Sequence, residues 1–286
     1  MKKLITSIVA MLLALATLFA VGCGKDQTTV VETDDQLAAL TEVQAGTSDI
    51  AVIDSVMANY YVNKPNFSDL TILSGQDFTF ANEYYAIGSR KNTNTDDYIN
   101  AALYQLQQVG RLNAIASKYG LQPALCTIPE FDYTALPAPN QVDPNSDFGK
   151  ILAKGKLVLG YTIFEPIAYM DGGKLIGFDI ELAEAVCSLY EIELVTQKIN
   201  WDTKEDELNS GNIDVIWNGF TWTEQRAENL DFSNYYMINR QAIVIRKADA
   251  QKYATYEGMS GATFACESES AGESTIRDII LPKVDA

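Results

Sequence analysis

The sequence predicts an α/β protein built from two similar lobes. One helix–turn–strand pattern occurs twice, at 40–54 and at 207–219. Around these copies, apolar runs of strand length alternate with longer segments of helical periodicity. The composition, 47% hydrophobic and 21% charged, is that of an ordinary globular chain. A length of 286 residues accommodates two modest domains, so we expect two α/β lobes.

The repeated pattern indicates where a site lies. In each copy a glycine closes a helix, an aspartate follows three residues later, and a buried strand ends five residues after the aspartate. Asp54 and Gly219 therefore occupy equivalent positions at the carboxyl ends of strands. Open α/β sheets bind ligands at that edge. We expect both residues to face a ligand site.

The other elements follow from hydrophobic periodicity. We expect strands at 28–32, 156–160 and 193–199, and helices at 35–44, 96–108, 112–119 and 177–189. Residues 121–147 contain five of the eight prolines, among Asn, Asp and Ser. This is the composition of an extended linker without a core of its own.

Charge and missing residue types exclude several functions. The formal net charge of −17 argues against a nucleic-acid partner, because phosphate binding needs basic patches. Histidine is absent, which excludes Ser-His-Asp and Cys-His catalysis and His-ligated metal sites. The four cysteines form no CxxC pair, which argues against a zinc ribbon or a thioredoxin-type site. We therefore expect neither a metal nor a cofactor.

The first 22 residues have the features of an export signal. Lys2 and Lys3 precede an apolar run from Leu4 to Val21, and small residues then lead into Cys23. This resembles a bacterial lipobox, in which the cysteine is lipidated and becomes the mature N-terminus. An uncleaved membrane anchor is the alternative, and both interpretations export the rest of the chain. We expect a signal peptide at 1–22 and a lipid anchor on Cys23.

The three remaining cysteines are odd in number and cannot all pair. Cys187 lies in an apolar helical run and is expected to be a small core residue. The sequence leaves open whether Cys126 and Cys266 form a disulfide.

Motif residues in both halves of the chain carry a family resemblance. In the second half they are Gly155–Gly160, Phe164-Glu165-Pro166, Gly177–Ala183, Gly219-Phe220-Thr221-Trp222-Thr223-Glu224-Gln225-Arg226-Ala227 and Asp231-Phe232-Ser233. In the first half they are the 46–54 pattern and Glu83-Tyr84-Tyr85-Ala86-Ile87-Gly88-Ser89-Arg90-Lys91. The chain resembles the extracellular solute-binding proteins of family 3, the substrate-binding lipoproteins of amino-acid ABC transporters. The resemblance implies the two-lobed type II periplasmic-binding-protein fold.

The order of these modules departs from the family, because the part that resembles the family's end comes first. The resemblance implies a circular permutation within lobe two. The expected parts are a signal peptide at 1–22, the first part of lobe two at 23–84, the C-terminal helices of lobe one at 85–120, a linker joining the family's old termini at 121–147, the main part of lobe one at 148–241 and the second part of lobe two at 242–286. A chance fusion of two partial genes is the alternative.

The resemblance also implies a ligand site. Arg226, in the matching motif, is the family's ligand for the carboxylate of an amino acid, and Asp54 matches the acid that takes the ammonium. Thr221 and the backbone of Gly219 match carboxylate- and ammonium-binding positions respectively. Ser270 precedes a helix in lobe two, where free backbone N–H groups favour an anion.

Two aromatic residues complete the expected site. Phe164 and Trp201 match positions that sandwich the ligand side chain. Each assignment has an alternative. Arg226 could form a surface ion pair, Asp54 could cap a helix at 55–61, and the two aromatic side chains could belong to the core.

The implied function is capture of a free, polar amino acid between the lobes and its delivery to an ABC permease. Lobe closure about two crossing strands, near 78–86 and 239–246, would follow ligand binding. We expect a monomeric, lipid-anchored, extracytoplasmic protein that is not an enzyme and has no catalytic residues. The alternatives are a dehydratase-like enzyme on the same fold, or a non-binding or sensory remnant of a fused tandem gene.

Overall fold

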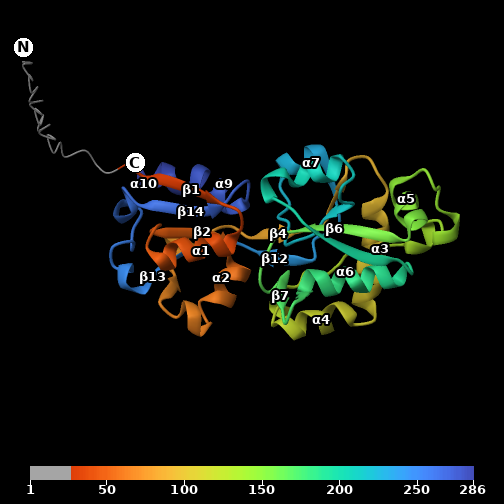
Figure 1. Cartoon of the computed structure of the whole chain (residues 1–286), viewed down its shortest axis with the longest axis horizontal. Coiled ribbons are helices and arrows are strands. Elements are labelled where there is room, and N and C mark those ends of the chain that lie inside the picture. Colours follow the sequence, from red (N-terminus) through yellow and green to blue (C-terminus); the bar gives the residue numbers. More distant parts are fainter. Residues whose placement is uncertain (1–26) are drawn as a thin grey trace, which may run out of the picture.

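The computed structural model describes residues 27–286, which form two α/β lobes lying side by side (Figure 1). Each lobe has a five-stranded sheet of its own. We call lobe one the part that contains residues 156–161 and lobe two the part that contains residues 50–54.

Lobe one carries most of the helices. Its elements, with the strand pair that joins the lobes, are β4 (Glu83–Tyr85), β5 (Gly88–Arg90), α3 (Thr95–Gln108), α4 (Arg111–Tyr119), α5 (Asp147–Lys154), β6 (Lys156–Tyr161), β7 (Tyr169–Asp171), β8 (Lys174–Ile176), α6 (Phe178–Leu189), β9 (Glu193–Lys198), α7 (Lys204–Asn209), β10 (Val215–Ile216), α8 (Glu224–Asn229), β11 (Leu230–Phe232) and β12 (Met237–Asn239). The strand order in its sheet is β9-β6-β10-β5-β11.

Lobe two is formed by both ends of the described chain. Its elements are β1 (Thr29–Thr33), α1 (Gln36–Ala45), β2 (Ile50–Asp54), α2 (Ser55–Tyr61), β3 (Leu70–Ile72), β13 (Gln241–Arg246), β14 (Thr263–Glu267), α9 (Ala271–Thr275), a π-helical turn (Ile276–Ile280) and α10 (Leu281–Val284). The strand order in its sheet is β1-β14-β2-β13-β3.

The two sheets have the same arrangement. In each, the first three strands are mutually parallel and the fourth strand is antiparallel to both of its neighbours. The chain visits the five positions of lobe one in the order four, two, one, three, five. In lobe two it visits them as one, three, five, four, two. These orders are cyclic shifts of each other.

The α/β class and most predicted elements are confirmed, and their ends move by a residue or two. The second copy of the repeat differs, because only Val215 and Ile216 pair as strand β10. The crossing strands are shorter than predicted. They are the antiparallel pair β4 and β12, between the lobes in Figure 1, while 241–246 belongs to the sheet of lobe two.

The proline-rich segment lies against lobe one through specific contacts. The backbone N–H of Cys126 donates to the carbonyl of Tyr236 at 3.0 Å. Ile128 is buried, and its backbone exchanges two hydrogen bonds with the side chain of Gln107. The segment therefore borrows the core of lobe one, in agreement with its lack of a core of its own.

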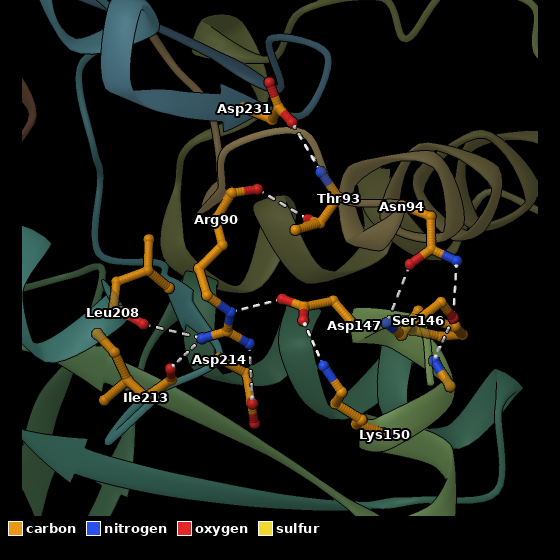
Figure 2. A network of polar contacts seen from close by, with 12 residues as sticks. Arg90, Thr93, Asn94, Ser146, Asp147, Lys150, Leu208, Ile213, Asp214 and Asp231 are labelled. Atoms are coloured by element: carbon orange, nitrogen blue, oxygen red, sulfur yellow. Dashed lines mark hydrogen bonds and ion pairs between the residues drawn. The ribbon is translucent and has the colours of Figure 1, made fainter. Parts of the chain in front are cut away.

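One arginine fastens the repeated unit of lobe one (Figure 2). Arg90, at the end of β5, donates Nη1 to the carbonyls of Leu208 and Ile213, at 2.9 Å each. Its Nη2 lies 3.5 Å from Asp214 Oδ1, and its Nε lies 2.5 Å from Asp147 at the start of α5. Buried carbonyls at the end of α7 and an aspartate before β10 thus share one cation.

Lobe two repeats the bonds of this arginine to two carbonyls and an aspartate, while its Nε binds an acid from a different position in the chain. Arg246, at the end of β13, donates Nη1 to the carbonyls of Val43 and Ser48 at 2.7 and 2.8 Å. Its Nη2 lies 3.3 Å from Asp49, and its Nε lies 2.7 Å from Asp249. The predicted repeat is therefore a repeat of tertiary contacts as well as of sequence.

Candidate ligand-binding site

A cavity between the lobes is lined by all seven residues that the sequence singled out. Lobe two contributes Asp54 and Ser270, and lobe one contributes Phe164, Trp201, Gly219, Thr221 and Arg226. The rest of the wall consists of Gln36, Asn218, Glu267 and Ala271. Asp54 and Glu267 end β2 and β14, so the cavity lies at the carboxyl edge of the sheet, where the repeat placed it.

Arg226 is held in place by backbone carbonyls. It lies in α8, where the side chain of Thr223 caps the helix by accepting from the Arg226 N–H. Nη1 donates to the Thr221 carbonyl at 2.8 Å, Nη2 donates to the Glu269 carbonyl at 3.0 Å, and the guanidinium lies over the Phe220 ring. Among residues 27–286, no carboxylate forms an ion pair with it, so the surface ion-pair alternative is wrong.

Asp54 is a buried carboxylate surrounded by amides. It accepts hydrogen bonds from Gln36 Nε2 at 2.6 Å, Gln241 Nε2 at 2.8 Å and Asn239 Nδ2. Burial raises the pKa of Asp54, while these amides and the positive charge of Arg226 oppose the shift. Its side chain makes no capping bond to α2, so the alternative role as a helix cap is wrong.

Gly219 is required by its conformation and its neighbours. Its φ is +60°, and a Cβ at this position would lie 2.6 Å from the Phe164 ring. Its N–H donates to Asp179 Oδ2 at 2.7 Å, and Tyr236 donates to the same oxygen at 2.8 Å. Burial raises the pKa of Asp179 to about 7. Asp179 thus fixes the turn that shapes the cavity, and its place at the start of α6, in the Gly177–Ala183 motif, was the available sequence signal.

Glu83 is a second acid beside Asp54 that sequence reasoning missed. It begins β4, and its Oε2 accepts from Gln241 Nε2 at 2.8 Å and from Asn239 Nδ2 at 3.3 Å. The Thr221 hydroxyl lies 3.5 Å from the same oxygen. Burial and the negative charge of Asp54 raise the pKa of Glu83 to about 7. The two acids share their amide donors, so the strand pair between the lobes is joined to the cavity.

The two aromatic residues line the cavity and also pack in the core. Phe164 meets Tyr85 edge to face, with ring centroids 6.2 Å apart. Trp201 meets Phe220 in the same way at 5.5 Å. Phe164 and Trp201 are therefore both core residues and residues of the cavity wall, because each is buried and each lines the cavity.

Ser270 has a structural role as well. Its hydroxyl accepts from the Glu273 N–H at 3.1 Å and caps α9, which is only five residues long. Glu269 has a φ of +55°, and its carbonyl faces lobe one. The hydroxyl of Ser270 is therefore engaged by its own helix, and Arg226 remains the main candidate for binding an anion.

Polar contacts close the cleft between the lobes. The Glu269 carbonyl of lobe two accepts from Arg226 and, at 3.2 Å, from Lys204 Nζ of lobe one. Lys64 of lobe two pairs with Glu165 of lobe one at 2.6 Å. Glu267 of lobe two accepts from the Thr162 hydroxyl of lobe one at 3.2 Å. The structure is therefore a closed form.

Several expectations concern other parts of the chain. The signal peptide at 1–22 and the lipidation of Cys23 lie outside the described residues. Cys126, Cys187 and Cys266 are all free thiols, so Cys126 and Cys266 do not form a disulfide in this structure. Within residues 27–286 there is no cluster of metal-binding side chains. No helix of this part of the chain is long and apolar enough to span a membrane.

Residues 157–280 match the family described as bacterial extracellular solute-binding proteins, family 3. The match contains Arg226 and all the motifs of the second half except the beginning of Gly155–Gly160.

Relatives with curated names are amino-acid-binding proteins. The chain is 31% identical over 104 residues to the arginine-binding extracellular protein ArtP of Bacillus subtilis, covering 36% of this chain and 41% of ArtP. It is 29% identical over 114 residues to the L-cystine-binding protein TcyJ of Escherichia coli, covering 39% and 43%. The chain thus spans about half the length, or less, of the curated relatives it matches.

A solved structure shows the same partial coverage. A histidine-bound ABC uptake transporter substrate-binding protein from Streptococcus pneumoniae is 38% identical, with a TM-score of 0.31, over 32% of this chain and 38% of that one. Another solved relative is described as an ancestral amino-acid-binding protein that preceded cyclohexadienyl dehydratase.

Proposed function

We propose that the protein binds one free, polar amino acid between its lobes and presents the closed form to an ABC importer. The observation that carries this proposal is the pair formed by Arg226 of lobe one and Asp54 of lobe two, which line one cavity. An amino acid carries a carboxylate and an ammonium at fixed spacing, and these two side chains have the complementary charges.

The roles of the other wall residues follow from this pair. The guanidinium of Arg226 retains N–H donors beyond those used by the carbonyls of Thr221 and Glu269, and these bind the ligand carboxylate. Asp54 and the carbonyl of Gly219 accept from the ammonium, while Thr221 and Ser270 border the carboxylate. Phe164 and Trp201 enclose the ligand side chain. A ligand that touches both lobes favours the closed form, which is the state that a permease can recognise.

We also propose that the chain is a circular permutant within lobe two. What supports this is the cyclic shift in strand order between two sheets with the same arrangement. In lobe one the second and first strands, β6 and β9, are joined through the β7–β8 hairpin and α6. In lobe two the equivalent strands are β14 and β1, and the helical segment 271–284 follows β14 as α6 follows β6. The proline-rich segment 121–147 then connects two parts of lobe one.

The anchoring proposal concerns the N-terminal region. Lipidation of Cys23 would hold the protein at the outer face of the membrane, beside its permease, as a monomer. Metabolic labelling with a fatty acid, comparing wild type with Cys23→Ser, tests this proposal. Label incorporation that survives the substitution contradicts it.

The alternative is a dehydratase-like enzyme on the same fold. One observation favours it, which is the solved relative described as a precursor of cyclohexadienyl dehydratase. Turnover of a bound compound, followed by mass spectrometry of the ligand after incubation, would favour it. Recovery of unchanged ligand supports a binding protein.

A thermal-shift screen against the common amino acids tests the main proposal. A ligand at a hundredfold excess over its Kd stabilises the folded state by about 2.7 kcal/mol. We expect such a shift with at least one amino acid and its loss in Arg226→Ala, while the exposed control Arg111→Ala keeps it. Absence of a shift with every amino acid would contradict the proposal.

A further inference from the structure

Glu267 is a buried acid of the cavity wall that the proposed roles leave unused. It ends β14, is 3% exposed and lines the cavity together with Asp54 and Arg226. Its Oε1 accepts from the Thr162 hydroxyl of lobe one at 3.2 Å, and this is the only hydrogen bond found for its carboxylate within residues 27–286.

No cation of the described chain pairs with Glu267. Lys204 is the nearby base, but its Nζ donates to the carbonyls of Trp201, at 2.9 Å, and Glu269, at 3.2 Å. The charges that act on Glu267 are mainly negative. Burial first, and then the charge of Asp54, raise the pKa of Glu267 to about 8, against the smaller opposing effects of Thr162 and Lys204.

A buried carboxylate without a counter-charge is costly. Asp54 has three amide donors, and one oxygen of Asp179 accepts from an N–H and a hydroxyl. The other oxygen of Asp179 has no partner in the described chain, but Asp179 does not line the cavity, whereas Glu267 does. Glu267 has one hydroxyl at long range, and its other oxygen accepts no hydrogen bond in the described chain. Because Glu267 lines the cavity, a ligand that enters it can supply the missing donors.

We propose that Glu267 determines specificity by pairing with the cationic side chain of a basic amino acid. This inference rests on the proposed function, in which Arg226 and Asp54 already hold the two α-groups of the ligand. The side chain is then the remaining part of the ligand that can supply a charge. Phe164 and Trp201 provide apolar walls suited to an aliphatic stem that carries a charge at its end.

A neutral amide side chain is the competing ligand, because a protonated Glu267 could donate to an amide oxygen. Calorimetric titration with L-arginine, L-lysine, L-glutamine and L-glutamate separates the two at pH 7. We expect wild type to bind L-arginine or L-lysine at least tenfold more tightly than the other two. Glu267→Gln should weaken that basic ligand at least tenfold and leave L-glutamine within threefold.

The matched control is Glu32→Gln, which removes a half-exposed carboxylate on β1 of the same lobe. It should leave every affinity unchanged. Titration in buffers of different ionisation enthalpy gives a second readout. The basic ligand should release close to one proton more on binding to wild type than on binding to Glu267→Gln, because Glu267 becomes charged beside the cation.

The failures of the two proposals are distinguishable. Equal or tighter binding of L-glutamine or L-glutamate by wild type overturns this inference while amino-acid binding stands. A uniform loss of affinity for all ligands in Glu267→Gln overturns it too, because that result indicates a structural role. Absence of binding for every amino acid overturns the proposed function, and this inference falls with it.

Discussion

Lobe one and lobe two contain the same helix–turn–strand unit but are assembled from the chain in different orders. In each unit an arginine binds two carbonyls and an aspartate, and we call this set of contacts the clamp. Arg90 with Asp214 in one lobe, and Arg246 with Asp49 in the other, bind equivalent carbonyls and acids. The aspartates also bond to equivalent strands. Asp214 accepts from the N–H of Val158 on β6, and Asp49 accepts from the N–H of Thr263 on β14.

The difference between the lobes shows what positions a site of this kind. Asp54 and Gly219 each lie five residues after the aspartate of the clamp. They line the same cavity although the strands of the two lobes follow one another in different orders along the chain. Strand adjacency and the arginine contacts place these residues, because both are contacts within one lobe that do not depend on the order of the segments along the chain. The order of the segments along the chain therefore does not decide which residues form the cavity wall.

The largest expected effect comes from removing the clamped aspartates. Asp214 has a side chain 4% exposed and lies 2.5 Å from Lys154, so Asp214→Ala leaves Lys154 without its partner and removes one of the two carboxylates beside Arg90. We expect a loss of about 3–5 kcal/mol in the free energy of unfolding. Asp49 is 29% exposed, and Asp49→Ala should cost less, about 1.5 kcal/mol.

Tryptophan fluorescence separates the two lobes in this experiment. All three tryptophans lie in residues 201–222 of lobe one, whereas circular dichroism reports on both lobes. Urea unfolding followed by both probes should show an earlier fluorescence transition for Asp214→Ala. If Asp214→Ala and Asp49→Ala lower the free energy of unfolding by the same amount, the different burial of the two aspartates does not determine how much each stabilises its lobe.

A pH effect is expected from Glu267. The folded protein keeps the proton of this acid up to about pH 8, while the unfolded chain loses it near the ordinary value of 4.5. The folded state therefore binds more protons in this window, and stability falls as pH rises through it. Glu267→Gln should flatten this fall in the ligand-free protein, with a higher Tm than wild type at pH 8 and a smaller difference at pH 5.

The control for the pH series is again Glu32→Gln, whose Tm should follow that of wild type. A Glu267→Gln profile parallel to that of wild type would indicate that Glu267 titrates normally. In that case the unpaired burial on which the specificity argument depends would be wrong.

A smaller effect is expected at the rim of the cleft. Lys64→Met removes the ion pair with Glu165 that joins the lobes, and the side chain of Lys64 is 37% exposed. An exposed pair of this kind contributes up to ~1 kcal/mol, so ligand affinity should fall by no more than about fivefold, and less at high salt. Calorimetry at two salt concentrations checks this. A loss of two orders of magnitude would place Lys64 in the ligand site itself.

The smallest effect is expected from reordering the chain. In a gene that runs from 147 to 286, then through a short Gly/Ser linker, then from 27 to 120, lobe two acquires the chain order of lobe one. Because the clamps and strand pairs are kept, we expect ligand affinity within threefold of the original. Loss of binding in a folded, reordered chain would show that chain order matters to the site.

Much of the fold could be predicted from the sequence because its signals are local. The glycine-to-aspartate spacing predicted both repeated units, and the G-x-T-x-T-x-x-R motif placed Arg226. The arginines of the clamps were missed, although each opens an Arg-Lys pair at the end of a strand, at 90–91 and 246–247. The carbonyls that they bind lie more than a hundred residues away in the sequence, and no local pattern reveals such a contact.

Two acids near Asp54 were harder to predict for the same reason. Glu83 begins β4 of the strand pair between the lobes, and Glu267 ends β14, which pairs with β2 although the two strands lie far apart in the sequence. The helix cap predicted as an alternative for Asp54 was wrong because amides from α1, β12 and β13 surround its carboxylate. Burial and shared donors are tertiary properties, so they require the structure.

The central claim is that each lobe supplies one half of a single amino-acid site. Calorimetry of wild type, Arg226→Ala and Asp54→Asn with the tightest amino acid found in the screen tests it most directly. We expect one ligand per chain for wild type and a loss of at least about 30-fold in each variant, because each leaves a buried charge of the ligand unpaired. Affinity within threefold of wild type in either folded variant would contradict the account, since that lobe would then contribute no essential contact.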